Sequence, residues 1–304
     1  MPIHNAAHTA HLLPYAKLVP AIAQAAQEYA DGRINAPERQ VVPIESGGVL
    51  LAMPAIAQDI GVTKVITVHG DNARHGLPAI QGEVIVFDSR TGQRHAIFDG
   101  PTVTSRRTAA VTLLGIQLLA PAAPVSALLI GSGVQAAAHA DALAEFFGVS
   151  RLLVASRNEH HSQAFCDALQ VRHPQVSATP IDASAIAARC REVDVVIALT
   201  TSTVPVIPAQ LPPSTMAVGV GAFKPEMAEI PAELLHARGV VVDHLAGARH
   251  EAGDLLRANI DWSKARDLAS VIRNGITGKS PAPVLKTVGH AVWDLAAARV
   301  AAGG

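Results

Sequence analysis

The stretch Ser126-Ala127-Leu128-Leu129-Ile130-Gly131-Ser132-Gly133-Val134-Gln135-Ala136 decides the fold of this chain. An apolar run leads into a glycine turn and then into alanine-rich sequence, which is the order of strand, turn and helix that holds a pyrophosphate in dinucleotide-binding proteins. Gly131 suits the tight turn, Gly133 lets the backbone approach the phosphates, and Ala136 allows close helix packing. The pattern predicts a Rossmann-type turn; an α/β turn that binds nothing is the alternative.

The sequence after this turn repeats the rhythm of strand and helix. Residues 137–147 are expected to be helical, and Gly148 ends that helix before a second strand at 151–156. A helix is predicted at 162–171 and another at 184–191. These are followed by apolar strands, which we place at 193–199, 216–220 and 239–243. Alternating strands and helices predict a parallel sheet with ligands at the carboxyl ends of its strands.

The end of the second strand indicates which dinucleotide binds. It ends in Ala155-Ser156-Arg157-Asn158, where an NAD-binding chain usually places an acid on the ribose hydroxyls. Ser156 can donate to a 2′-phosphate and Arg157 can pair with it, whereas an acid would repel it. We therefore predict NADPH, with NADH less favoured. The residues expected to bind it lie in the glycine turn or at strand ends: Gly131, Ser132, Gly133, Val134, Gln135, Ser156, Arg157, Asn158, Thr200 and Thr201.

Length and composition limit the class of protein. The 304 residues are 49% hydrophobic and 16% charged, which fits a globular protein of two domains. The formal net charge is -1, and no cluster of basic residues suggests nucleic acid or a membrane surface as a partner, so we expect a small-molecule ligand. The start of the chain has no signal-peptide pattern, which predicts a cytoplasmic protein. Cys166 and Cys190 are expected to be buried free thiols, and no metal site is predicted.

The chain before the glycine turn has a different character. A helix is predicted at 14–31 and a second at 105–119. The short alternating segments between them predict a mostly antiparallel sheet, with strands at 40–44, 49–53, 64–68, 82–88 and 95–99. A last helix is predicted at 287–302. The fold class is therefore α/β, with a Rossmann-type domain at 122–286 inserted into an α+β domain made of 1–121 and 287–304.

Several motifs together resemble the ornithine cyclodeaminase and mu-crystallin family over nearly the full chain. They are, in order, Met53-Pro54-Ala55, Lys64-Val65-Ile66-Thr67-Val68, Gly76-Leu77-Pro78, Asp99-Gly100, Thr104-Ser105-Arg106-Arg107-Thr108-Ala109-Ala110, the glycine turn, Glu251-Ala252-Gly253-Asp254-Leu255 and Lys286-Thr287-Val288-Gly289. The resemblance implies a homodimer built on the antiparallel domain. Family members include ornithine-cyclising lyases, alanine dehydrogenases, opine-like synthases and reductases of cyclic ketimines.

The resemblance also implies which cations hold the carboxylate of a substrate. These positions fall on Arg39, Lys64 and Arg107, and Arg107 with Thr108 is assigned to the cofactor as well. An arginine fork suits a planar carboxylate, and a lysine in a partly dry cleft can also donate a proton. We expect Lys64 to keep the substrate nitrogen protonated. His69 is the second candidate, because histidine is the residue type that most often gains and loses a proton near neutral pH.

One departure from the lyases separates the possible activities. The cyclodeaminases have an acid where this chain has Phe223. An aromatic ring can neither accept a proton from an ammonium group nor form an ion pair with it. The change resembles the branch that reduces Δ1-pyrroline-2-carboxylate to L-proline and Δ1-piperideine-2-carboxylate to L-pipecolate by hydride transfer to C2. The alternatives are an ornithine cyclodeaminase, an alanine dehydrogenase and a non-catalytic binder of NADP and small ligands. The sequence does not rank the two ring sizes.

Overall fold

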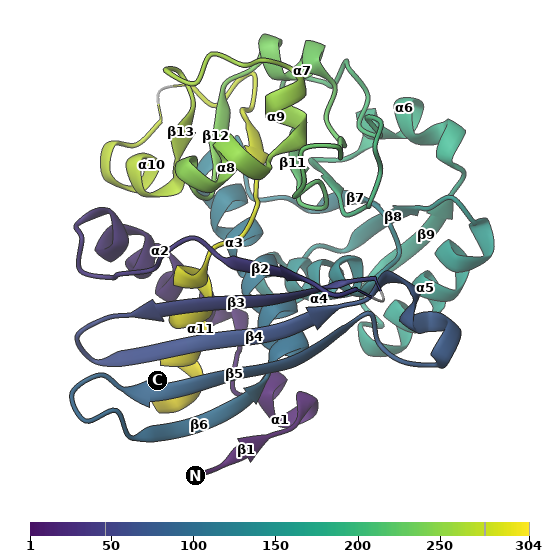
Figure 1. Cartoon of the computed structure of the whole chain (residues 1–304). Coiled ribbons are helices and arrows are strands. Elements are labelled where there is room, and N and C mark those ends of the chain that lie inside the picture. Colours follow the sequence, from purple (N-terminus) through teal and green to yellow (C-terminus); the bar gives the residue numbers. More distant parts are fainter. Residues whose placement is uncertain (46, 277, 304) are drawn as a thin grey trace. The chain divides into compact units, whose positions relative to one another are not determined.

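The computed structural model describes residues 1–45, 47–276 and 278–303. The chain divides into two compact units, unit 1 with residues Met1–Ala110 and His290–Gly304, and unit 2 with residues Val111–Gly289. Figure 1 shows the elements of both units in sequence colours. The division falls inside helix α3 (Gly100–Leu119). That helix is longer than predicted, because a carboxylate oxygen of Asp99 accepts the Thr102 amide at 2.8 Å and so caps its first turn.

Unit 1 is built on a six-stranded sheet in the order β1-β6-β5-β4-β3-β2. Its strands are β1 (Ile3–His4), β2 (Gln40–Pro43), β3 (Val49–Ile56), β4 (Ile60–Val68), β5 (Ile80–Asp88) and β6 (Arg94–Asp99). The predicted antiparallel pairing is confirmed for β2 to β6. The short β1, which was not predicted, pairs in parallel with β6 at the edge.

One face of this sheet is covered by a helix, and a second helix packs against that helix. Helix α11 (Ala291–Gly303) packs against α2 (Tyr15–Ala30) and against β3, β4 and β5. The unit also contains the short helix α1 (Ala6–His11) and a 3-10 helix at Gly70–His75. Along β4, Val62, Lys64 and Ile66 are buried, whereas Val65 is 36% exposed on the other face. The strand alternation therefore turns Lys64 toward the covered side of the sheet.

The last helix begins later than the sequence pattern predicts. It starts at Ala291 and not at residue 287, because Val284–Lys286 forms a strand and Gly289 has a φ of +83°. Asp243 holds the turn between them, since its carboxylate accepts the amides of Val288 and Gly289 at 2.9 and 2.8 Å. A left-handed glycine interrupts a helix, so the polar turn remains outside α11.

Unit 2 contains an eight-stranded sheet in the order β13-β12-β14-β11-β10-β7-β8-β9. Every neighbouring pair is parallel. The strands are β7 (Ser126–Ile130), β8 (Arg151–Ala155), β9 (Ser177–Ile181), β10 (Val195–Ala198), β11 (Met216–Gly219), β12 (Val240–Val242), β13 (Arg266–Asp267) and β14 (Val284–Lys286). The order reverses between β7 and β10, which is the switch point where doubly wound sheets bind ligands.

The helices of unit 2 connect these strands. They are α4 (Val134–Phe147), α5 (Glu159–Arg172), α6 (Ile186–Arg189), α7 (Ala232–Ala237), α8 (Leu245–Glu251), α9 (Gly253–Arg257) and α10 (Leu268–Asn274), with 3-10 turns at Ala183–Ala185 and Cys190–Glu192. Strand β9 was not predicted, because it contains Pro180. It lies at the edge of the sheet, where a residue without an N–H is tolerated.

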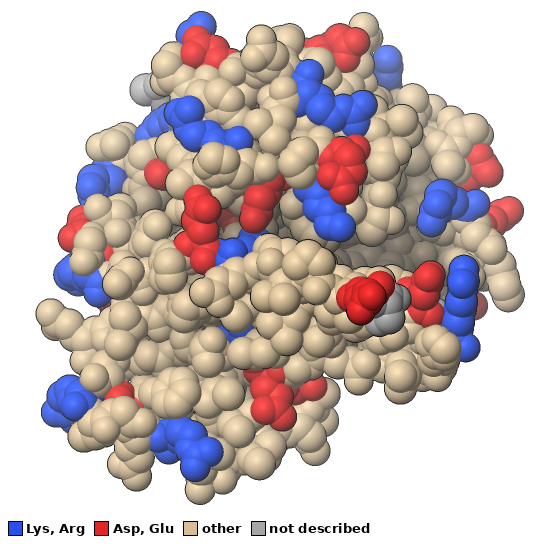
Figure 2. All heavy atoms as spheres, in the orientation of Figure 1, with Lys and Arg blue, Asp and Glu red and all other residues tan. Residues whose placement is uncertain are grey.

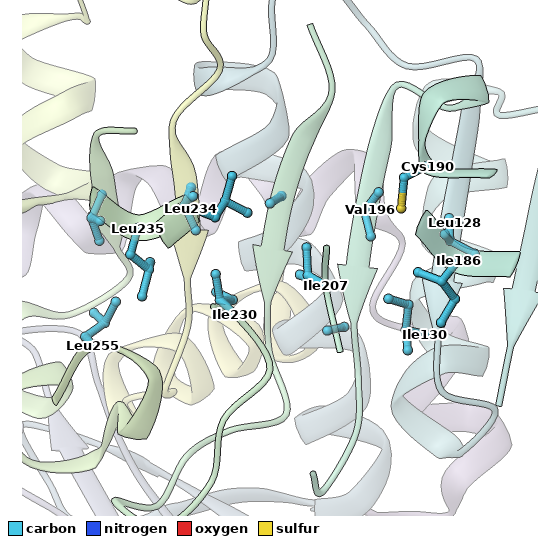
Figure 3. Close-up of a cluster of buried hydrophobic side chains, with 14 of the residues drawn as sticks. Leu128, Ile130, Ile186, Cys190, Val196, Ile207, Ile230, Leu234, Leu235 and Leu255 are labelled. Carbon is cyan, nitrogen blue, oxygen red and sulfur yellow. The ribbon is translucent and has the colours of Figure 1, made fainter. Parts of the chain in front are cut away.

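A hydrophobic core lies against the parallel sheet of unit 2. Side chains from β7, β10, β12 and the helices α7 and α9 meet in it, as Figure 3 shows for Leu128, Val196 and Leu255. Cys190 belongs to this core, and both cysteines are buried free thiols, as predicted. Burial raises the pKa of Cys166 to about 11 and that of Cys190 to about 12, which makes both poor nucleophiles.

The surface carries charges of both signs. On the face drawn in Figure 2, Lys and Arg side chains lie interspersed with Asp and Glu side chains, in keeping with the formal net charge of -1. None of the helices within the described residues combines the length and the apolar run needed to span a bilayer.

Candidate functional site

Unit 1 holds a buried cluster of one acid and two bases. Lys64 Nζ lies 2.8 Å from Oδ2 of Asp294, and Arg107 Nε lies 3.0 Å from Oδ1 of the same carboxylate. The side chains of Lys64, Arg107 and Asp294 are 1%, 7% and 0% exposed. One carboxylate therefore orders two cations, and the three groups together carry an excess positive charge.

Three separate elements bring these side chains together. Lys64 comes from β4, Arg107 from α3 and Asp294 from the first turn of α11, where the residues on either side are buried and apolar. A lone acid in such a helix requires a partner, because an unpaired carboxylate loses its hydration on burial. The packing of α11 on β4 supplies that partner and fixes the direction of the Lys64 ammonium.

The charges of the cluster shift the pKa values of its members. The pKa of Lys64 is lowered to about 8, first by burial and then by the positive charges of Arg107 and Arg39, against the opposing effect of Asp294. Burial alone would raise the pKa of Asp294, but the charges and hydrogen bonds of Lys64 and Arg107 outweigh it and lower the pKa. Lys64 therefore releases its proton far more readily than an exposed lysine.

Arg39, Lys64 and Arg107, the three cations expected to hold a substrate carboxylate, lie close enough for the charges of Arg39 and Arg107 to act on Lys64. Arg39 is half-buried just before β2, and its charge is among those that lower the pKa of Lys64. Thr108, the neighbour of Arg107 on α3, is half-buried. Three cations and one carboxylate leave a net positive site that suits a small carboxylate ligand.

His69 occupies a different place. It follows the end of β4, and a Cβ added to Gly48 would lie 2.6 Å from its Nδ1, so the imidazole lies beside that glycine. Five residues of extended chain separate it from Lys64, a distance of about 16 Å. Within the described part of the chain, no hydrogen bond or ion pair joins His69 to the cluster of Lys64, Arg107 and Asp294. As a proton donor, His69 stays a prediction.

In unit 2 the glycine turn has the form that an anion site requires. Gly131 has a φ of +122°, and a Cβ there would lie 2.6 Å from the carbonyl oxygen of Leu199. Gly133 caps α4 without any side-chain hydrogen bond, and nothing lies within 4 Å of a Cβ added to it. Ala136 is fully buried under the turn. The amides at the start of α4 are thus left for a phosphate, and the site fits a dinucleotide.

The residues that follow β8 form the short loop that leads into α5. Arg157 and Asn158 are exposed, and Asn158 caps the helix because its Oδ1 accepts the His160 amide at 2.9 Å. The hydroxyl of Ser156 lies 2.7 Å from the Asn158 carbonyl oxygen and 2.7 Å from the Ser162 hydroxyl. Ser156 already donates within the loop, so Arg157 is the more available partner for a 2′-phosphate.

The loops after β10 and β11 carry Thr200 and Phe223. Thr200 donates both its amide and its hydroxyl to Oε1 of Glu229, at 2.6 and 2.9 Å, whereas Thr201 is exposed. Phe223 is 37% exposed beyond β11. Burial raises the pKa of Glu229, while the charge of Lys286 and the hydrogen bonds from Thr200 act in the opposite direction. The position of Thr200 is therefore set by a buried acid.

Sequence reasoning missed two acids, Asp294 and Glu229. Asp294 had a readable signal, because it is the one acid within the otherwise apolar segment 291–298. Glu229 lies in a loop with no periodic pattern, and nothing in its immediate sequence distinguishes it from a surface glutamate. In the part of the chain that the structure describes, no group of three or more His, Cys, Asp or Glu side chains is placed to hold a metal ion.

Comparison with known proteins identifies a family and several enzymes to which the chain is similar. The model of the ornithine cyclodeaminase/mu-crystallin family matches residues 2–302. The chain is 46% identical over 301 residues to a Delta(1)-pyrroline-2-carboxylate reductase 2 of Burkholderia ambifaria, covering 99% of this chain and 95% of that protein. It is also 46% identical over 301 residues to a Delta(1)-pyrroline-2-carboxylate/Delta(1)-piperideine-2-carboxylate reductase of Azospirillum brasilense, with the same coverage of 99% and 95%.

A solved structure has the same fold. The Delta(1)-pyrroline-2-carboxylate reductase of Thermococcus litoralis, solved in complex with NADH and L-proline, aligns with a TM-score of 0.90. The alignment covers 99% of this chain and 96% of the other at 23% sequence identity. The likeness to that structure is one of fold.

Proposed function

This chain belongs to the ornithine cyclodeaminase/mu-crystallin family, and from that premise we propose that it is an NADPH-dependent reductase of cyclic ketimines. Its substrates would be Δ1-pyrroline-2-carboxylate, which yields L-proline, and Δ1-piperideine-2-carboxylate, which yields L-pipecolate. Reductases with these names are 46% identical to it over almost the whole chain. We further propose that residues 122–286, which include the whole parallel sheet, form the cofactor domain.

The observation that carries this proposal is the pair of buried cations on one carboxylate. Lys64 and Arg107 are held by Asp294, and Arg39 adds a third positive charge that acts on Lys64. A planar carboxylate next to a C=N bond is the ligand that such a site would orient. Orientation is worth several kcal/mol in a reaction that needs little other help from the protein.

The residues have distinct roles in the proposed reaction. Arg107, Lys64 and Arg39 bind the carboxylate, and Lys64 keeps the imine nitrogen protonated so that C2 is electrophilic. His69 is the second candidate for that proton. NADPH, when bound, supplies the hydride that C2 accepts, and the π electrons of the C=N bond then become the lone pair of the ring nitrogen. Phe223 would form an apolar wall for a flat ring.

The preference for NADPH is supported by the sequence that follows β8. No acid occupies 156–158, and Arg157 is exposed at the start of α5. Its guanidinium is available to pair with a 2′-phosphate, which NADH lacks. The pyrophosphate of the dinucleotide is proposed to bind at the Gly131–Gly133 turn, because the start of α4 there has no side-chain cap.

A homodimer is supported by the uncovered face of the sheet in unit 1. Register partners place Ile3, Ile97, Ile85, Thr63 and Pro54 in one row across five strands. On the same face Val65 is 36% exposed and Ile56 48% exposed. Apolar sheet faces of this kind are normally covered, and a second copy of the chain would cover it. Light scattering of the parent and of Ile85→Glu tests this, and a monomeric parent would contradict it.

One set of assays separates the possible activities. NADPH oxidation is followed with each cyclic ketimine and with pyruvate plus ammonia, and proline and ammonia are measured after incubation with ornithine and NAD. We expect turnover of the ketimines alone. Turnover of ornithine at a comparable rate would favour the lyase, amination of pyruvate an alanine dehydrogenase, and cofactor binding without turnover of any substrate a binding protein.

A further inference from the structure

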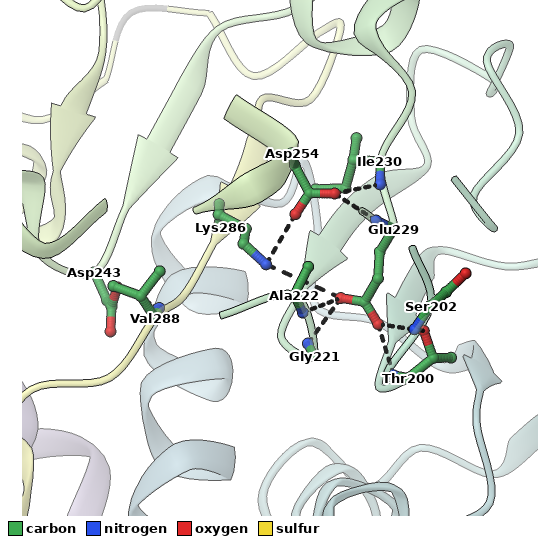
Figure 4. A network of polar contacts seen from close by, with 10 residues as sticks. All are labelled: Thr200, Ser202, Gly221, Ala222, Glu229, Ile230, Asp243, Asp254, Lys286 and Val288. Carbon is green, nitrogen blue, oxygen red and sulfur yellow. Dashed lines mark hydrogen bonds and ion pairs between the residues drawn. The ribbon is translucent and has the colours of Figure 1, made fainter. Parts of the chain in front are cut away.

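Glu229 lies at the centre of a buried polar network in unit 2, which Figure 4 shows. Its Oε1 accepts the amide and hydroxyl of Thr200, at 2.6 and 2.9 Å. Its Oε2 accepts the amides of Gly221 and Ala222, at 2.7 and 3.1 Å. One carboxylate therefore ties together the loops that follow β10 and β11.

Two further residues hold Glu229 itself. Oδ1 of Asp254 accepts the amides of Glu229 and of Ile230, the latter at 2.8 Å. Lys286 Nζ lies 3.0 Å from Oδ2 of Asp254 and 4.0 Å from Oε2 of Glu229. Asp254 and Lys286 belong to the motifs at 251–255 and 286–289, for which the proposed reaction gives no role.

Two glycines allow the backbone to come this close. A side chain on Gly221 would collide with the backbone of Thr200 and with the carboxylate of Glu229. A side chain on Gly253 would collide with the carbonyl oxygens of Lys224, Pro225 and Met227. The backbone is therefore fixed on both sides of Phe223. Glu229 holds the two residues that precede Phe223, and Gly253 packs against the residues that follow it.

We propose that Glu229 is a positioning residue that sets the Thr200 turn and the Phe223 segment at the carboxyl edge of the parallel sheet. The inference rests on the proposed function, in which Thr200 is among the residues that bind the dinucleotide and Phe223 forms an apolar wall for the ring of the substrate. Each carboxylate oxygen of Glu229 accepts two hydrogen bonds, so the site requires a side chain that ends in two acceptor atoms. Glutamine does not meet this requirement, because its NH2 would face two donors.

Hydrogen exchange tests the network without any assay of activity. The amides of Thr200, Gly221 and Ala222 lie beyond the ends of β10 and β11, so their protection depends on Glu229. In the parent protein they should exchange at least about tenfold more slowly than exposed loop amides. Exchange at the rate of exposed amides in the parent would overturn the proposal, even if no variant folds.

Two variants then separate positioning from stability. Glu229→Gln should speed exchange at these amides, lower kcat with the ketimine about 10- to 100-fold, and increase the kinetic isotope effect with deuterated NADPH. KM for NADPH should change less than about twofold, because the pyrophosphate turn is untouched. Arg238→Lys is the matched control, since Arg238 is buried in the same unit and donates to the carbonyl oxygens of Leu211, Pro212, Thr215 and Ala282.

The control should lower thermal stability and leave the isotope effect and the exchange of the three amides unchanged. If Glu229→Gln and Arg238→Lys lose kcat in proportion to their loss of stability, with the same isotope effect as the parent, Glu229 is only structural and the proposal is wrong. A parent protein that protects these amides but reduces no ketimine would contradict the proposed function and leave the network established.

Discussion

The ammonium of Lys64 lies 2.8 Å from Oδ2 of Asp294, and both side chains are almost completely buried. The pair would be costly if either partner were removed, because the other charge would remain without compensation. Asp294 also accepts Arg107 through its other oxygen, so the direction of both cations depends on one carboxylate. The proposed substrate site of unit 1 is therefore preorganised by an acid that does not need to touch the substrate.

Replacement of that acid should affect stability and binding together. Asp294→Asn leaves two buried cations with a neutral partner, so we expect a loss of about 3–5 kcal/mol in the free energy of unfolding and a higher KM for the ketimine. Urea denaturation measures the first and steady-state kinetics the second. Asp59→Asn is the control, because Asp59 pairs with Arg299 while 57% exposed and should cost less than about 1 kcal/mol. Equal losses for the two variants would contradict the role of Asp294.

Removal of Arg107 should weaken the binding of the transition state without unfolding unit 1, because Lys64 still compensates the charge of Asp294. We expect Arg107→Ala to lower kcat/KM by an amount that corresponds to about 2–4 kcal/mol of transition-state stabilisation, the cost of truncating one member of a buried charged contact. Lys64→Ala should lower kcat as well. The comparison is made at saturating NADPH. Activity of Arg107→Ala within twofold of the parent would place the substrate carboxylate elsewhere.

The pH dependence of activity should report Lys64. Its pKa is lowered to about 8, so the ammonium is present below that pH and is lost as the pH rises through it. Binding of the carboxylate and kcat/KM should therefore fall above about pH 8, since kcat/KM follows the free enzyme. The imine of the substrate also titrates, so inhibition by pyrrole-2-carboxylate serves as a second measure. Lys64→Arg keeps its charge, and a fall that persists unchanged in that variant would assign it to another group.

Arg157 should determine the choice of cofactor. Arg157→Ala should narrow the preference for NADPH over NADH by roughly 1.5–3 kcal/mol, or about 10- to 150-fold in the ratio of kcat/KM values. Arg172→Ala is the control, because Arg172 is the last residue of α5, at the end of the helix opposite Arg157, and pairs with Asp141 at 3.0 Å. Equal kcat/KM values for NADH and NADPH in the parent would contradict the preference itself.

The sequence predicted the elements with strong patterns, and the structure shows why others escaped it. The glycine turn, α4 and the strands on either side follow from apolar runs and from Gly131 and Gly148, which have positive φ angles. Strand β14 is only Val284–Lys286 and follows Pro283, so its pattern is too short to read, whereas β9 contains Pro180, which argues against a strand. Their place in the sheet depends on neighbours distant in sequence, β11 and β12 for β14.

The same contrast holds for the candidate site. Lys64 and Arg107 were found because they belong to motifs of the family, and the structure pairs both with one buried acid. The partner itself, Asp294, was not found, since its contacts arise only when α11 packs on β4. Glu229 was missed for a related reason, because its four donors come from loops that the sheet brings together.

The central claim is that this enzyme reduces a preformed cyclic ketimine, and the most direct measurement is the initial rate of NADPH oxidation with Δ1-pyrroline-2-carboxylate, with the product identified. Hydride delivery to C2 predicts one L-proline for each NADPH consumed, together with no detectable proline or ammonia from ornithine and NAD. No oxidation of NADPH by either the five- or the six-membered ketimine, or release of proline and ammonia from ornithine at a comparable rate, would contradict the account.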